Sequence, residues 1–213
     1  MKKTVLLGVL SLVIMGLTAC GPDGGTDPID TGTPVETPPE APLIIKPSEL
    51  ISAEEAGSIT GETMADDLLD STENQGPATM RTVYLGDEYM FQIALAQDSM
   101  LDENAPEDQT YIANGGVAGA IERLTDARER NAYNQEILDL RGDDYTGYLI
   151  DENGMGFWSC EIFYKNYLIT IVINYNPPTA HTRENPEEES GWRVGALIDA
   201  SKIALANLRK LAG

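Results

Sequence analysis

The chain has 213 residues, and its 35 Asp and Glu residues against 14 Lys and Arg give a formal net charge of −21 at pH 7. Such a surface repels nucleic acid, so we expect no nucleic-acid partner, whereas cations and basic partners are attracted. The alternative is that the charge serves only as a solvated surface. A folded domain of about 170 residues buries roughly 70% of its unfolded surface, which is enough for a core of its own.

The N-terminal segment has the composition of a secretory signal. Two lysines follow Met1, and an apolar run extends from Thr4 to Leu17. That run is about 14 residues long, short of the about 20 that a membrane-spanning helix needs. It ends in Leu17-Thr18-Ala19-Cys20, which resembles the lipobox of bacterial lipoproteins at all four positions.

The resemblance to this family implies a signal peptide of residues 1–19 and a lipid on the sulfur of Cys20. It places the protein on the extracytoplasmic face of the cell membrane, with the lipid anchor as its membrane contact. Gly21, not Asp, follows the cysteine, so the resemblance carries no inner-membrane retention signal. Two alternatives are cleavage without lipidation and an uncleaved anchor.

The next segment, residues 20–42, is rich in Pro, Gly, Asp and Glu and contains no Lys or Arg. Such a composition cannot bury enough apolar surface to offset its ordering entropy, so we expect a disordered tether. Residues 43–213 then form a single domain.

The first half of the domain is predicted from local signals. Ser52 and Glu55 form a capping box that starts a short helix to about Ile59, and Gly61 is placed to end it. The patterns that follow predict an irregular stretch (62–79), two strands (80–85 and 88–96), an acidic loop (98–109) and a helix (117–131).

The clearest pattern lies in residues 157–175, which read as a hairpin turning at Lys165 and Asn166. One register sorts its side chains into an apolar face and a mixed face, as a half-buried antiparallel sheet requires. The apolar face pairs Tyr164 with Tyr167, Ile162 with Ile169, Cys160 with Ile171, and Trp158 with Ile173. The mixed face pairs Phe163 with Leu168, Glu161 with Thr170, Ser159 with Val172, and Phe157 with Asn174.

Strands near 136–140 and 145–151 precede the hairpin, and a terminal helix over 192–211 carries an apolar stripe. We expect this helix to cover the isoleucine-rich face. The fold class is therefore α+β, an antiparallel sheet packed against helices. The order of elements resembles that of small bacterial lipoproteins of the PsbP-like α-β-α sandwich type. Because this family has no established active site, the resemblance implies no catalytic residues.

The chemistry-bearing side chains are sparse. Cys160 lies mid-strand on the apolar face, where burial makes a thiol inert, and His181 stands alone in a loop. We therefore expect no catalytic residues and no cofactor. The mixed-face residues Phe163, Leu168 and Val172 are the predicted interaction surface; the alternative is that a second helix covers them.

Two loops allow weaker hypotheses. Oxygen-bearing side chains in the acidic loop suit a calcium ion, with the ligand set Asp98, Asp102, Asn104 and Asp108; the alternative is a solvated loop. The glycines of Asn114-Gly115-Gly116 precede a helix, as in a phosphate loop, but their spacing matches only in part. Because no parallel βαβ unit surrounds them and the acidic chain repels a polyanion, we do not expect nucleotide binding there.

Taken together, the sequence predicts a membrane-anchored extracytoplasmic lipoprotein with a non-catalytic binding domain. Its partner is an envelope protein or a small ligand that the sequence does not identify. The alternatives are a carboxylate-based hydrolase, because Asp and Glu are abundant enough to supply an acid/base pair, and a structural surface protein.

Overall fold

The computed structural model describes residues 43–131, 135–151, 158–176 and 186–213. The predicted signal peptide, Cys20 and the tether lie outside these ranges, as do Phe157 and His181. Within the described ranges, no helix has both the length and the apolarity that crossing a membrane requires.

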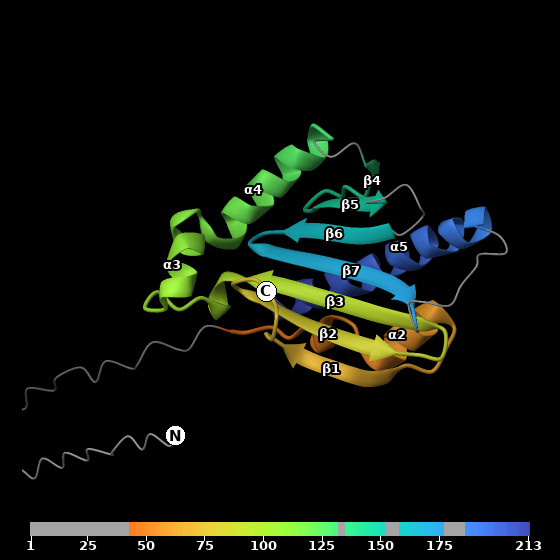
Figure 1. Ribbon diagram of the computed structural model, residues 1–213. Helices are drawn as coiled ribbons and strands as arrows, with labels where there is room; N and C mark the ends of the chain where they lie inside the picture. Colours follow the sequence, from red (N-terminus) through yellow and green to blue (C-terminus); the bar gives the residue numbers. More distant parts are fainter. Residues whose placement is uncertain (1–42, 132–134, 152–157, 177–185) are drawn as a thin grey trace, which may run out of the picture. The chain divides into compact units, whose positions relative to one another are not determined.

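One antiparallel sheet forms the centre of the domain (Figure 1). Its seven described strands are arranged in the order β1-β2-β3-β7-β6-β5-β4. Two meanders, β1 to β3 and β4 to β7, meet where β3 pairs with β7 over nine residue pairs, from Tyr89–Tyr175 to Gln97–Tyr167. The strands are β1 (Ala65–Ser71), β2 (Thr79–Leu85), β3 (Tyr89–Gln97), β4 (Glu136–Asp139), β5 (Thr146–Asp151), β6 (Trp158–Tyr164) and β7 (Tyr167–Tyr175).

The β6–β7 hairpin has the predicted register. Cys160 pairs with Ile171 on one side of the sheet, and Glu161 pairs with Thr170 on the other. The side that carries Cys160 and Ile171 is called the first face below, and the side that carries Glu161 and Thr170 is called the second face. Alternation continues into β3, where Phe91, Ile93 and Leu95 lie on the first face and are fully buried.

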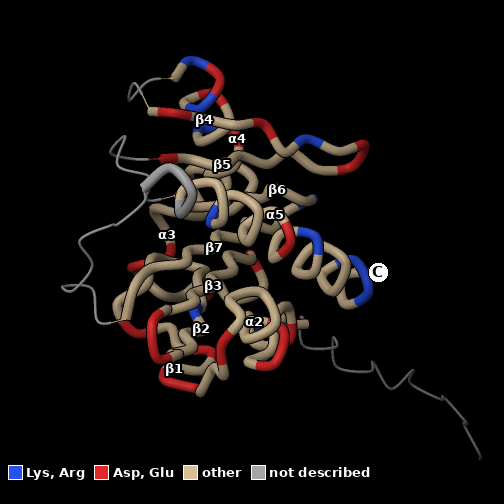
Figure 2. The backbone as a smooth tube through the Cα atoms, turned by 90° about the vertical axis from the view of Figure 1, so that its right-hand side faces the viewer, with Lys and Arg blue, Asp and Glu red and all other residues tan. Residues whose placement is uncertain are grey.

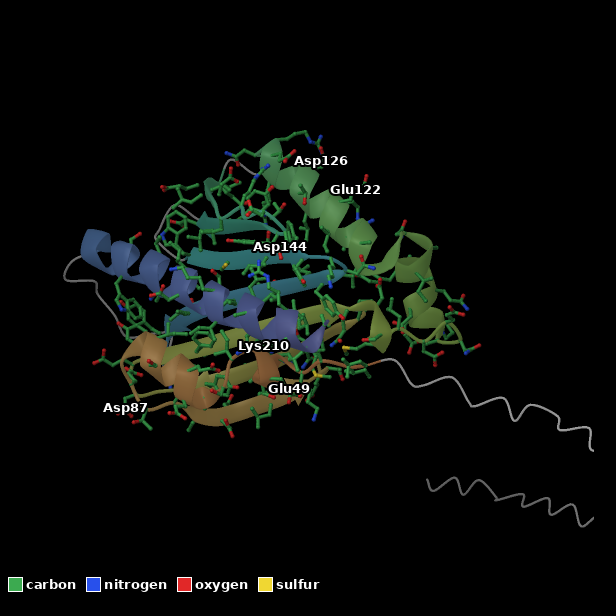
Figure 3. The ribbon with its side chains drawn as sticks, turned by 180° about the vertical axis from the view of Figure 1, so that it is seen from behind. Glu49, Asp87, Glu122, Asp126, Asp144 and Lys210 are labelled. Carbon is green, nitrogen blue, oxygen red and sulfur yellow. The ribbon has the colours of Figure 1, made fainter. Side chains whose placement is uncertain are left out.

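Helices from both ends of the domain cover the first face. Figure 3 shows α5 (Pro186–Leu211) and α2 (Ala53–Thr60) lying over it, and the short α1 (Pro47–Leu50) contacts α5 as well. The stripe of α5 buries Leu197, Leu205 and Leu208 completely or nearly so in the main core, which confirms the docking of this helix. The helix begins at Pro186, six residues before the predicted start at Trp192.

The capping box predicted for α2 is present. The Ser52 backbone N–H donates to Glu55 Oε2 at 2.8 Å, and the Glu55 N–H donates to Ser52 Oγ at 3.2 Å. Gly61 ends the helix with a φ of +81°, a left-handed conformation that glycine adopts without steric cost.

Two other helices lie on the second face. The helix α4 (Gly116–Glu129) packs Ile121 and Leu124 against a small cluster of Tyr148, Ile150 and Phe163. The helix α3 (Pro106–Ala113) precedes it and follows a single 3-10 turn, η1 (Asp98–Met100). The sheet therefore lies between helices on both faces, and the predicted α+β class is confirmed.

Two predictions about irregular segments were wrong. Residues 65–71 form β1, an edge strand that pairs with β2. Its polar sequence, Ala-Asp-Asp-Leu-Leu-Asp-Ser, does not predict a strand. An edge strand needs a partner on one side only and tolerates exposed charge, so it lacks a clear alternating pattern. Within the predicted acidic loop, Pro106 occupies the first turn of α3, where its missing N–H costs nothing.

Candidate functional site

The predicted interaction surface is divided by α4. Phe163 is only 4% exposed, and Leu168 packs against its cluster and against a second cluster of Ala78, Ala96 and Val117. The alternative that a second helix covers this surface therefore applies to Phe163, and Leu168 is partly buried beside it. Val172 is half-buried and belongs to neither cluster.

Val172 belongs to the part of the second face that no described helix covers. Figure 1 shows the second face of β2, β3 and β7 with α4 and α3 displaced toward one end of these strands. The register gives the residues of this uncovered part. Arg81, Ala94 and Thr170 lie in one row across three strands, and Gln92 and Val172 lie in the next, beside the buried Val83 of β2. These five half-buried residues are called the open face.

Arg81 is the unusual member of the open face. Between Lys46 and Arg123 it is the sole basic residue, against sixteen Asp and Glu residues. Its Nε is buried without a hydrogen-bond partner, and Nη1 reaches Gln92 Oε1 only at 3.5 Å. In the part of the chain that the structure describes, Arg81 forms no ion pair. The sequence alone offered one signal for it, namely its isolation among carboxylates.

The carboxylates proposed as calcium ligands accept hydrogen bonds from backbone N–H groups of the protein. Asp108 Oδ2 accepts from the Asp102 N–H at 2.9 Å, and Asp102 Oδ1 accepts from the Asn104 N–H at 2.8 Å. Asp98 Oδ1 accepts from the Val117 N–H at 2.8 Å, on a different helix. The described residues contain no group of three or more acidic, His or Cys side chains arranged to hold a metal. The four oxygen-bearing residues therefore do not converge as one calcium site.

The glycines before α4 serve the same Asp98 contact. Gly115 and Gly116 both have positive φ angles, and a Cβ on Gly116 would lie 2.5 Å from Asp98 Oδ1. Since Asp98 already occupies the N-terminus of α4, a phosphate would have to displace a carboxylate of the same charge. This arrangement disfavours a phosphate at the N-terminus of α4.

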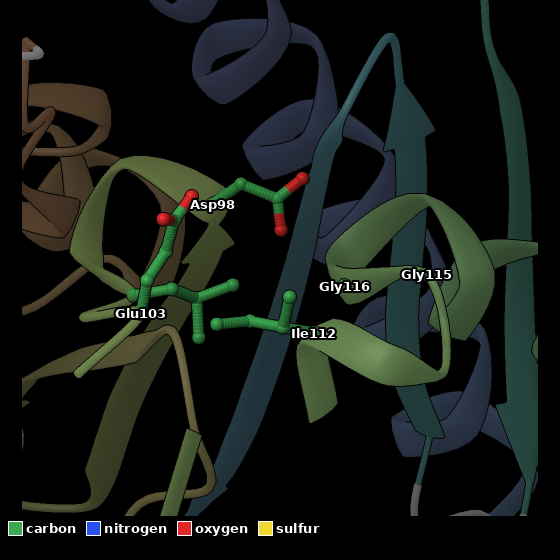
Figure 4. Close-up of a pocket in the computed structure, with 6 residues that line it drawn as sticks. Asp98, Glu103, Ile112, Gly115 and Gly116 are labelled. Carbon is green, nitrogen blue, oxygen red and sulfur yellow. The ribbon is translucent and has the colours of Figure 1, made fainter. Parts of the chain in front are cut away.

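Beside Asp98 lies a cavity of about 250 Å³ (Figure 4). Its lining comes from the end of β3, from α3 and from the turn between α3 and α4. The figure shows the carboxylates of Asp98 and Glu103 on the same side, with Ile112 opposite them. Leu101, Gly115 and Gly116 complete the lining. Asp98 also lines a second cavity of about 330 Å³ that includes Lys165 and Tyr167.

Cys160 is fully buried and free. Burial raises the pKa of its thiol far above the ordinary range, with a smaller contribution from Glu161, so the thiolate does not form near neutrality. The predicted burial of Cys160 in the core is confirmed.

Comparison of the chain with protein-family models, with curated proteins and with solved structures finds no match. The lipobox and PsbP-like resemblances therefore stay predictions from the sequence.

Proposed function

We propose that this chain is a lipid-anchored protein of the extracytoplasmic membrane face, whose domain binds an envelope partner through the open face without catalysis. The sequence Leu17-Thr18-Ala19-Cys20 supports the anchor. The single observation that carries the binding role is the unequal covering of the sheet. The first face is sealed by α5, α1 and α2, whereas the second face is covered only where α4 and α3 pack.

The open face has the chemistry of a recognition surface. Arg81 offers a guanidinium, Gln92 offers an amide, and Thr170 offers a hydroxyl beside the apolar Val172. An arginine gains most from a carboxylate or carbonyl acceptor that replaces the water lost on burial. A partner that covers this face and supplies such an acceptor would pair with the half-buried Arg81 side chain.

The same residues argue against the hydrolase alternative at this face. General acid/base cleavage by two carboxylates needs both side chains beside the reacting bond. None of the five open-face residues carries a carboxyl group. We therefore favour binding over hydrolysis here.

The test is capture of partners from the protein's own membranes by the full-length protein and by variants. Val172→Lys and Arg81→Gln alter the open face, and Leu138→Lys is the matched control, because Leu138 is 41% exposed on the opposite edge strand β4. Partners captured by the wild type and the control should be lost with both open-face variants. If the open-face variants keep their fold and capture the same partners, the proposal is wrong.

A further inference from the structure

The cavity beside Asp98 combines negative charge with apolar walls. Two of its lining side chains, Asp98 and Glu103, are carboxylates, and two, Leu101 and Ile112, are aliphatic. No basic side chain lines it. Both carboxylates lie on one side of the space (Figure 4), so a cation placed there would meet both.

Neither carboxylate is paired with a basic side chain in the described part of the protein. Asp98 accepts a hydrogen bond from the Val117 N–H at the start of α4, and Glu103 forms no hydrogen bond with a described residue. Arg123 of α4 and Lys165, which lines the second cavity with Asp98, bind backbone carbonyl oxygens. Arg123 Nη1 donates to the Asn114 carbonyl oxygen at 3.0 Å, and Lys165 Nζ donates to the Gly213 carbonyl oxygen at 3.1 Å.

The part of the domain around the cavity is also negatively charged. The tube in Figure 2 shows Asp and Glu concentrated around β1, β2 and α2, whereas Lys and Arg lie near the C-terminal end of α5 and around α4 and β4. The segment from Pro47 to Glu122, which contains all six residues of the cavity lining, carries Arg81 as its sole basic residue. A positively charged ligand is therefore drawn toward this part of the domain.

The lining selects an organic cation over a metal ion. Calcium takes about six to eight oxygen ligands, far more than two carboxylates provide, and aliphatic walls add none. An alkylammonium group fits both parts of the lining, because its –NH3+ donates to carboxylates while its methylene chain lies along apolar surface. At about 250 Å³ the cavity is also smaller than the roughly 300–1,000 Å³ typical of sites for drug-sized ligands.

We propose that this cavity binds an alkylammonium group, with Asp98 and Glu103 accepting its hydrogen bonds and Leu101 and Ile112 contacting its methylene chain. The group is supplied either by a lysine side chain of a basic partner or by a free aliphatic amine. The site is separate from the open face, so it does not rest on the proposed function.

The experiment is calorimetric titration of the full-length protein, purified in detergent, with two amine probes. One is lysine capped at both ends by acetyl and N-methylamide groups, and the other is 1,5-diaminopentane. Capped norleucine, which lacks the charge, and calcium chloride are the comparison ligands. Stronger binding of the capped lysine identifies a peptide source, and stronger binding of the diamine identifies a free amine.

The decisive variant is Glu103→Gln, because Glu103 is exposed and its substitution breaks no hydrogen bond within the described structure. Amine affinity should fall roughly tenfold, the order expected for losing a hydrogen bond to a charged group. Glu107→Gln is the matched control: Glu107 is exposed on α3, does not line the cavity and changes the net charge equally. Its affinity should stay within about twofold, because distant exposed charges are screened.

Four results would overturn the proposal. They are an absence of amine binding, equal binding of capped norleucine, equal weakening by Glu107→Gln, and calcium binding that Glu103→Gln abolishes while amines do not bind. Loss of partner capture by the open-face variants is a separate measurement, so failure of one proposal does not imply failure of the other.

Discussion

Arg128 of α4 holds Glu161 of β6 in a two-point ion pair on the second face. Its Nε donates to Glu161 Oε2 at 3.0 Å, and its Nη2 donates to Oε1 at 2.8 Å. The side chains are 8% and 12% exposed, and Nη1 also donates to Gln135 Oε1 at 2.7 Å. The pair ties the helix, the sheet and the segment after the helix together. In the sequence, Arg128 only interrupts the apolar stripe of α4.

Replacing Glu161 with Gln should lower the free energy of unfolding by about 3–5 kcal/mol, because it removes the negative charge that Glu161 places beside the buried Arg128 guanidinium. The matched control is Glu129→Gln, which breaks the surface pair with Arg141, whose side chains are about half exposed. That change should cost under about 1 kcal/mol. Urea unfolding of both variants checks the difference. An equal loss of unfolding free energy in the two variants would show that the buried pair stabilises the domain no more than the surface pair does.

Adjacent residues of β7 should differ sharply in their contribution to stability. Ile171 is fully buried on the first face, whereas Thr170 is half-buried on the second. Truncating Ile171 to Ala should cost roughly 2–5 kcal/mol, the usual penalty for emptying a core site. Thr170→Ala should cost well under about 1 kcal/mol. Thermal and urea unfolding measure both, and the reverse order would contradict the register.

Tyr84 should give the domain an alkaline limit to its stability. Burial, with nearby Asp66 and Asp70, raises the pKa of its hydroxyl from 10.0 to about 12, and Tyr84 Oη donates to the Ile51 carbonyl oxygen at 2.7 Å. Because the folded state keeps the phenol protonated, this stabilisation is complete below pH 10 and is lost as the pH rises toward about 12.

Urea unfolding at pH values from below 10 to about 12 tests this, with Tyr84→Phe as the comparison. The variant should be less stable by about 1 kcal/mol at neutral pH, because it loses one buried hydrogen bond. Its stability should also fall less steeply over the alkaline range. Parallel pH profiles for the two proteins would assign the alkaline loss to other groups.

Replacing Cys20 with Ser should abolish membrane attachment. The lipid is expected on the cysteine sulfur, and stable anchoring depends on acyl chains that serine at this position does not receive. Fractionation of cells that express the variant should show uncleaved precursor and no processed protein in the lipid-anchored fraction. Normal processing and membrane retention of the Ser variant would refute the lipoprotein assignment.

Where the chain carries a strong local or alternating signal, the sequence was sufficient. The capping residues Ser52 and Glu55 determined the start of α2, and strict alternation around Lys165 and Asn166 determined the register of the β6–β7 hairpin. It also determined that Cys160 is buried. These features depend on neighbouring residues, whose spacing on a helix or strand is fixed by backbone geometry.

Contacts between distant segments were decided only by the tertiary structure. The path of α4 buries Phe163 of β6 and leaves Val172 of β7 half-buried, although both lie on the second face of the sheet. The pairing of Arg128 with Glu161, 33 positions apart, and the location of Asp98 at the N-terminus of α4 have no local pattern. Side chains of one polarity can face solvent, a partner or a cavity, and the packing of distant segments selects among these because burial favours arrangements in which polar groups find hydrogen-bond partners.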